Sequence, residues 1–207
     1  MAKLSTPVTI TFKAFDGATG SSAGRKNANS DPSSTVKGDF SILTWPSTPK
    51  INQSIEVNYS TWELQHTNYQ PSAFGNRATP VITLSGPWFS RDTEEATRTI
   101  NAIHLLRSAT SMYYGREDGN KGTPPPVGRL NAHGLYNNTP VVVKSFNYDF
   151  PNDVDYVTAS AFGGSQAVPV LFEMSVSLIV QITPLEAVKE YTLNKFVNGS
   201  LLGNGYI

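Results

Sequence analysis

Apolar and polar residues alternate strictly near the end of the chain, and this pattern limits the possible fold more than any other sequence feature. The apolar positions are Met174, Val176, Leu178, Val180 and Ile182. Successive side chains of a strand point to opposite faces, so the alternation predicts a half-buried β-strand. Residues 8–14 and 55–59 alternate in the same way, and shorter strands are expected within 40–45, 81–85 and 129–136. The sequence therefore predicts a mainly β protein of antiparallel sheets, as a sandwich or barrel.

Two helix starts interrupt this pattern. Asp92 with Glu95 predicts a capped helix that ends at Gly115 and carries a broad apolar stripe, so we expect it to lie across a sheet. Thr183 with Glu186 forms a second capping box around Pro184, where a short C-terminal helix is expected. Alternatively, part of the apolar stripe of the long helix contacts a neighbouring subunit instead of the sheet.

Composition excludes several functions. A chain of 207 residues fits one domain, 1–207, and its 16 basic and 16 acidic residues leave no net charge to attract nucleic acid or anionic membrane. Cysteine is absent, which excludes disulfides and thiolate chemistry. No apolar run reaches the roughly 20 residues that a membrane-spanning helix needs. A secretory signal is also absent from the first residues, so synthesis in a cytoplasm is expected.

Two segments are candidates for contact with other subunits. The polar segment 16–38 holds one large apolar residue, Val36, and is either a mobile surface loop or an arm that orders against an adjacent subunit. Its proposed anchors are Arg25, Lys26 and Lys37. The C-terminal extension 195–207 is unusually apolar and either folds back on its own domain or docks on another subunit. Its proposed interface residues are Leu201, Leu202, Tyr206 and Ile207.

No catalytic or metal site is predicted, and no cofactor is expected. The run Gly20-Ser21-Ser22-Ala23-Gly24 matches a nucleophile elbow but lacks the strand and helix that this motif needs. The histidines lack the paired spacing of a zinc helix. The acidic turn after residue 150 lacks the glycine and closing glutamate of a calcium loop. A P-loop motif is absent, and the three prolines at 124–126 are interpreted as a stiff spacer.

The order of motifs between residues 80 and 193 resembles the tail-tube-like baseplate proteins of contractile-tailed bacteriophages. The motifs are ITLSGPWFSRDTEEA, GTPPPVGRLNAHGLY, a strand that ends in FPNDVDY, and a closing strand that runs into TPLEA. The resemblance implies a tail-tube type of fold and a homomeric ring, expected to have six copies, that initiates or extends the inner tube. It implies no catalysis, a place in the virion tail or baseplate after assembly in the host cytoplasm, and other tail-tube and baseplate hub proteins as partners.

If the sheet lines a channel, the polar strand faces should turn toward water. They are Glu56, Asn58, Ser60, Asn147, Asp149, Glu173, Ser175, Ser177 and Gln181. These residues include acids but no lysine or arginine, which predicts a neutral to negative lumen that passes DNA without holding its phosphates. The alternative is a carbohydrate-binding or host-recognition sandwich, in which Trp45, Trp62 and Trp88 with the tyrosines form a stacking platform.

Overall fold

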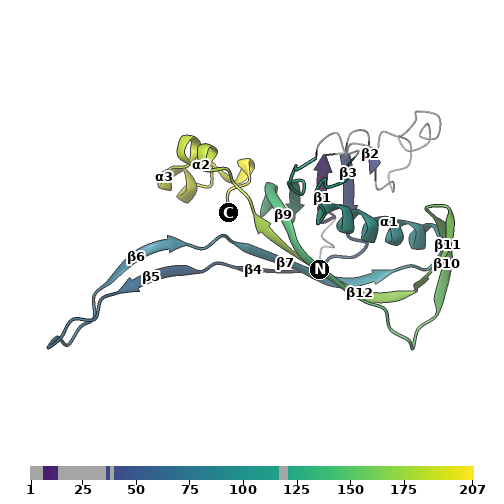
Figure 1. Ribbon diagram of the computed structural model, residues 1–207, viewed down its shortest axis with the longest axis horizontal. Helices are drawn as coiled ribbons and strands as arrows, with labels where there is room; N and C mark the ends of the chain where they lie inside the picture. The colour runs from purple at the N-terminus through teal and green to yellow at the C-terminus, as the bar shows by residue number, and fades with distance from the viewer. Residues whose placement is uncertain (1–6, 14–35, 38–39, 117–120) are drawn as a thin grey trace.

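The computed structural model describes residues 7–13, 36–37, 40–116 and 121–207 and is shown in Figure 1. It contains twelve described strands, three described α-helices and one described 3-10 helix. In chain order they are β1 (Thr9–Lys13), β2 (Val36–Lys37), β3 (Phe40–Thr44), β4 (Lys50–Ser54), β5 (Val57–Thr61), β6 (Ser72–Arg77), β7 (Val81–Phe89), α1 (Thr93–Ala109), β8 (Gly128–Ala132), β9 (Tyr136–Asp149), β10 (Tyr156–Ala161), β11 (Gly164–Pro169), β12 (Leu171–Val180), α2 (Pro184–Glu190), α3 (Leu193–Val197) and η1 (Leu202–Asn204). The predicted mainly β, antiparallel class is confirmed.

Eight strands form one antiparallel sheet in the order β2-β3-β1-β8-β9-β12-β7-β4. The long strand β9 belongs to both halves of it, because its first part pairs with β8 and its second part pairs with β12. In Figure 1 the strands of the β1–β3 half cross the direction of β7 and β12, and α1 lies over β12. The turned sheet and α1 therefore enclose a common interior.

The core fills this interior with side chains from all three parts. Phe12 and Leu130 come from one half of the sheet, Leu84 and Val176 come from the other half, and Leu106 comes from α1. All five are fully buried. The face of β12 that alternation predicted is the buried one, since Phe172, Met174, Val176, Leu178 and Val180 are all buried.

Helix α1 begins where the sequence predicts and ends earlier. The Glu95 amide donates to the Asp92 side chain at 2.8 Å, and the Glu95 carboxylate accepts from the Arg91 amide at 2.8 Å. The helix ends at Ala109 rather than near Gly115. The hydroxyls of Thr110 and Ser111 donate to the Arg107 carbonyl, and such bonds compete with continuation of the helix.

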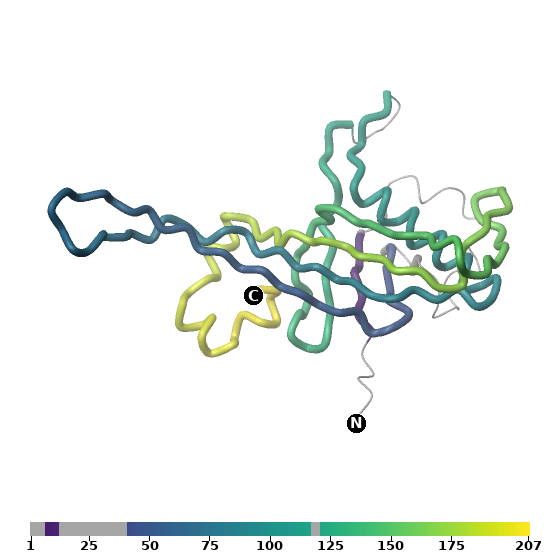
Figure 2. The backbone as a smooth tube through the Cα atoms, turned by 90° about the horizontal axis from the view of Figure 1, so that it is seen from below, coloured from purple at the N-terminus to yellow at the C-terminus, as the bar shows by residue number. Residues whose placement is uncertain are grey.

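The two-stranded ladder β5–β6 extends the β4–β7 ladder away from the core as a hairpin, which Figure 2 shows projecting beyond the rest of the molecule. Every residue of β5 is exposed. The prediction that residues 55–59 form a strand is right for 57–59, but the prediction that one face of that strand is buried is wrong. Alternation reports that a strand has two unlike faces and cannot report what covers either of them.

A second hairpin, β10–β11, is not predicted by the sequence. It packs against α1, and the Phe162 ring in its turn lies 4.3 Å from the His104 ring of α1, centroid to centroid. Phe162 has φ of 51°, a left-handed conformation that is unfavourable for a bulky side chain.

The C-terminal segment folds back on its own chain. η1 packs on β9, and Leu201 and Tyr206 are 4% and 6% exposed. Gly205 adopts φ of 82° beside the backbone of Asn138 and Thr139, a conformation and proximity that suit only glycine. For Leu201 and Tyr206 the intramolecular alternative is therefore correct, because their apolar surface is already covered. Leu202 remains exposed, and Ile207 is half-buried.

Candidate assembly surface

One face of the strands β9, β12, β7 and β4 is polar. Residues directly opposite one another in an antiparallel ladder share a face. The rows across the sheet, from β9 toward β4, are Asp149, Glu173 and Pro87; then Asn147, Ser175, Ser85 and Lys50; then Ser145, Ser177, Thr83 and Asn52. The hydroxyls of Thr83 and Ser177 lie 3.4 Å apart in this surface. The face is rich in hydroxyl and amide groups and carries few charges.

The structure brings five of the nine predicted lumen residues together on this polar face. They are Asn147, Asp149, Glu173, Ser175 and Ser177. Gln181 is exposed just after β12, and the other three, Glu56, Asn58 and Ser60, are exposed at the start of the hairpin and within it. None of the nine points into the core.

Sheet register adds a cation that the sequence did not place on this face. Lys50 of β4 lies opposite Ser85, and Ser85 lies opposite Ser175. Lys50 therefore joins the predicted residues on this face, and the neutral to negative lumen stays a prediction. Lys144 is also exposed, at the irregularity where the pairing of β9 with β12 shifts register. Pairing between strands far apart in sequence decides the composition of a face, and no single strand reveals it.

The hairpin carries the largest concentration of uncovered apolar side chains among the described strands. Between residues 55 and 74 they are Ile55, Val57, Tyr59, Trp62, Leu64, Tyr69 and Phe74. Tyr59 and Phe74 meet edge to face with ring centroids 6.1 Å apart. An isolated two-stranded hairpin is at best marginally stable in water, so this surface is suited to contact with another chain. Sequence reasoning missed this role because the alternation in 55–59 was interpreted as a core face.

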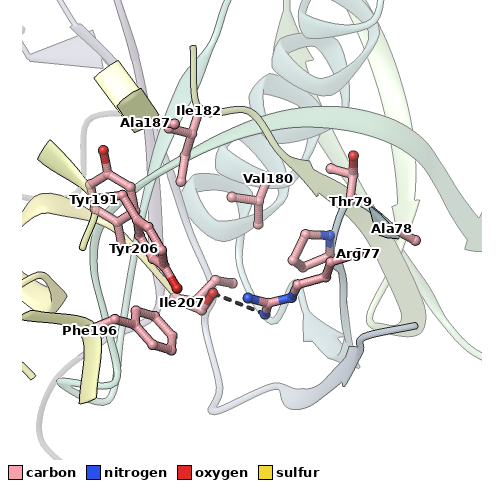
Figure 3. Close-up of a pocket in the computed structure, with 11 residues that line it drawn as sticks. Arg77, Ala78, Thr79, Val180, Ile182, Ala187, Tyr191, Phe196, Tyr206 and Ile207 are labelled. Carbon is pink, nitrogen blue, oxygen red and sulfur yellow. Dashed lines mark hydrogen bonds between the residues drawn. The ribbon is translucent and has the colours of Figure 1, made fainter. Parts of the chain in front are cut away.

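A cavity of about 350 Å³ lies between the base of the hairpin and the C-terminal helices (Figure 3). Tyr191, Phe196 and Tyr206 stand together along one side of it, and Arg77 stands on the other side. The Tyr191 ring lies 5.7 Å from Phe196 and 6.0 Å from Tyr206. Arg77 Nη2 donates to the Ile207 carbonyl at 3.2 Å.

The Tyr206 hydroxyl is buried and has no hydrogen-bond partner among the described residues. Burial raises the pKa of this phenol, and the carboxylates of Glu190 and Glu186 raise it further. The phenol is therefore protonated at neutral pH and able to donate a hydrogen bond. Buried hydroxyls are normally satisfied, so this group is notable at the wall of a cavity.

The proposed arm anchors Arg25 and Lys26 lie outside the described residues, as does the run from Gly20 to Gly24. Lys37 lies in β2, which pairs with β3. The described residues contain no group of three or more His, Asp or Glu side chains placed to hold a metal ion. The described helices include none with the length and apolar character to span a membrane.

The tryptophans do not form a common platform. Trp45 and Trp88 are both 3% exposed and meet each other in the core, with ring centroids 5.6 Å apart. Trp62 is exposed at the far end of the hairpin. A sugar-stacking surface built from the three indoles is therefore excluded.

No protein-family model matches the sequence, and no curated protein sequence matches it. Among solved structures, one similar chain belongs to the tail of an empty GTA particle, determined with helical refinement and C6 symmetry. The match covers 70% of this chain and 84% of that chain, with a TM-score of 0.32 and 10% sequence identity. A similarity of this size carries no argument about function.

Proposed function

We propose that the protein is a non-catalytic structural component of a bacteriophage-type tail, assembled from identical copies into a ring. The observation that carries the proposal is the β5–β6 hairpin, which leaves its own core and exposes large apolar side chains on a two-stranded ladder. The sequence resemblance to tail-tube-like baseplate proteins supports the same role. On that basis the ring has six copies, lies in the virion at the junction of baseplate and tube, and contacts other tube and baseplate hub proteins.

The hairpin suits this role for two reasons. Within the part of the chain that the structure describes, its strands pair only with each other, and β4 is an edge strand of the large sheet. Unpaired edges accept strands from another chain, and burial of a large apolar side chain contributes about 1.5–3 kcal/mol. A neighbouring copy can therefore cover both the open edges and the apolar surface.

The polar face of the sheet is the proposed channel wall. Its described charges are the acids Asp149 and Glu173 and the base Lys50, so their formal sum is −1. A surface with few lysines and arginines releases few counterions from DNA and so binds it weakly. This composition suits a channel through which DNA passes without specific binding.

The test is the oligomeric state of the purified chain, measured by native mass spectrometry and by electron microscopy of negatively stained particles. The full chain should form a closed ring, and a Y59S/F74S double variant should be a folded monomer at the same concentration. The matched control is L185S/V188S, which removes two exposed apolar side chains from α2 instead. A full chain that stays monomeric at all concentrations, or a Y59S/F74S variant that still forms rings, would contradict the proposal.

Ring stacking distinguishes the finer roles. A chain that acts as a repeating tube subunit should polymerise into long tubes by itself, whereas an initiator should stop at single or paired rings. Electron microscopy of the same sample gives this result directly.

A further inference from the structure

The cavity beside Arg77 has the features of a binding site for one particular kind of partner. Its aromatic side provides apolar surface, while Arg77 and the unpartnered Tyr206 hydroxyl provide two hydrogen-bond donors. Among the described residues Arg77 donates one hydrogen bond, to the Ile207 carbonyl, whereas a guanidinium has five N–H donors. The occupant should therefore insert a ring and present an acceptor, preferably a carboxylate, next to it.

The far end of the hairpin carries this combination. Trp62, Glu63 and Leu64 follow one another there, all three are exposed, and Trp62 and Leu64 are 57% and 58% exposed. Glu63 is the only acid in the segment 62–71, which contains no lysine or arginine. An aromatic ring beside a carboxylate thus complements an aromatic wall beside a guanidinium.

The segment does not reach the cavity of its own chain. The Trp62 amide donates to the Pro71 carbonyl, so Trp62 lies just beyond the first residue of β6. Arg77, which lines the cavity, is the last residue of β6, at the opposite end of the strand. Five steps along a strand span about 17 Å. Figures 1 and 2 show the hairpin extending away from the C-terminal helices, so only a second copy can supply the segment.

We propose that Trp62 of one copy inserts into the cavity formed by Tyr191, Phe196 and Tyr206 of the next copy, with Glu63 bonded to Arg77. This inference rests on the proposed ring and names the contact that closes it. Trp62 and the cavity lie on different surfaces of the chain, so the contact is head-to-tail. Such a contact generates a ring when the rotation from each copy to the next adds up to a full turn.

The test measures the protein concentration at which half of the full-length chain is assembled, by sedimentation velocity. W62A should raise this concentration at least about tenfold, as expected for a central aromatic anchor, while the control Y69A should change it less than about twofold. E63R and R77E should each raise this concentration about tenfold. In the E63R/R77E double variant it should fall most of the way back to the wild-type value. Near-UV circular dichroism checks that each variant keeps the fold.

Cross-linking provides a second, direct measurement. The chain has no cysteine, so L64C/T79C introduces a single pair, with one thiol at the hairpin end and one beside the cavity. Oxidation of assembled protein should give a ladder of covalent multimers that stops at the ring number, while L64C alone should give none beyond a dimer.

The outcomes separate this inference from the proposed function. The Trp62 contact would be overturned if W62A formed rings at the wild-type concentration. It would also be overturned if E63R/R77E failed to restore assembly and oxidised L64C/T79C gave no ladder of multimers. Either result would leave the proposed ring intact. A wild-type chain that never assembles would overturn both.

Discussion

Substituting Gly205 by alanine should loosen the C-terminal segment while leaving the main core folded. A Cβ at this position would lie 2.7 Å from the Asn138 carbonyl oxygen and 2.7 Å from Pro140 Cδ, and these atoms belong to the backbone and to a rigid ring. The φ of 82° adds the cost of a left-handed alanine. Leu201 and Tyr206, the buried side chains of this segment, lie outside the main core cluster.

The magnitudes decide the form of the effect. Left-handed strain of about 1–2 kcal/mol and overpacking of about 1–3 kcal/mol oppose docking. Burial of Leu201 and Tyr206 favours docking by about 1.5–3 kcal/mol for each side chain. The segment should therefore remain mostly docked, with its local opening equilibrium raised at least roughly 30-fold.

Amide hydrogen exchange of residues 201–206 measures this opening, and trypsin cleavage after the exposed Lys195 reports it independently. The control is Gly134→Ala, since Gly134 has φ of 72° but no atom within 4 Å of an added Cβ. It should carry the left-handed strain without faster exchange at 201–206. Wild-type exchange rates in the Gly205→Ala protein would refute the argument that this segment is held by close contact with β9.

Two further perturbations test the core and its ionisation. Gly128→Ala should lower the free energy of unfolding by about 1–3 kcal/mol in urea denaturation, because its Cβ would lie 2.7 Å from Phe12 Cε1. The control Gly164→Ala, whose Cβ would have no atom within 4 Å, should change this free energy by less than about 0.5 kcal/mol. Equal losses in the two variants would contradict the packing argument. Burial raises the pKa of Tyr136 and Tyr206 above the ordinary 10.0, so the unfolded chain loses these protons first and stability should fall as pH rises above about 10. Unfolding midpoints measured from pH 8 to 11 should fall less steeply for Tyr206→Phe than for the wild type, and identical slopes would show that this phenol does not contribute.

Local sequence determined the elements whose signals are complete within a few residues. The alternation in β12 fixed which face is buried, because side-chain direction in a strand depends on the chain's own geometry alone. Asp92 and Thr183 determined where α1 and α2 begin, because a capping bond joins atoms three residues apart. The predicted polar faces of β9 and β12 are indeed turned away from the core for the same local reason.

Tertiary structure alone decided which surfaces are covered. Pairing of β4 with β7 placed Lys50 on the polar face, and docking of η1 on β9 buried Leu201 and Tyr206. The same packing left the hairpin uncovered although its residues 55–59 alternate like a core strand. The cavity joins Arg77 to Tyr191, Phe196 and Tyr206, residues more than a hundred positions apart. Alternation and capping are short-range properties, whereas coverage depends on which distant segments meet, and that is settled only when the whole chain packs.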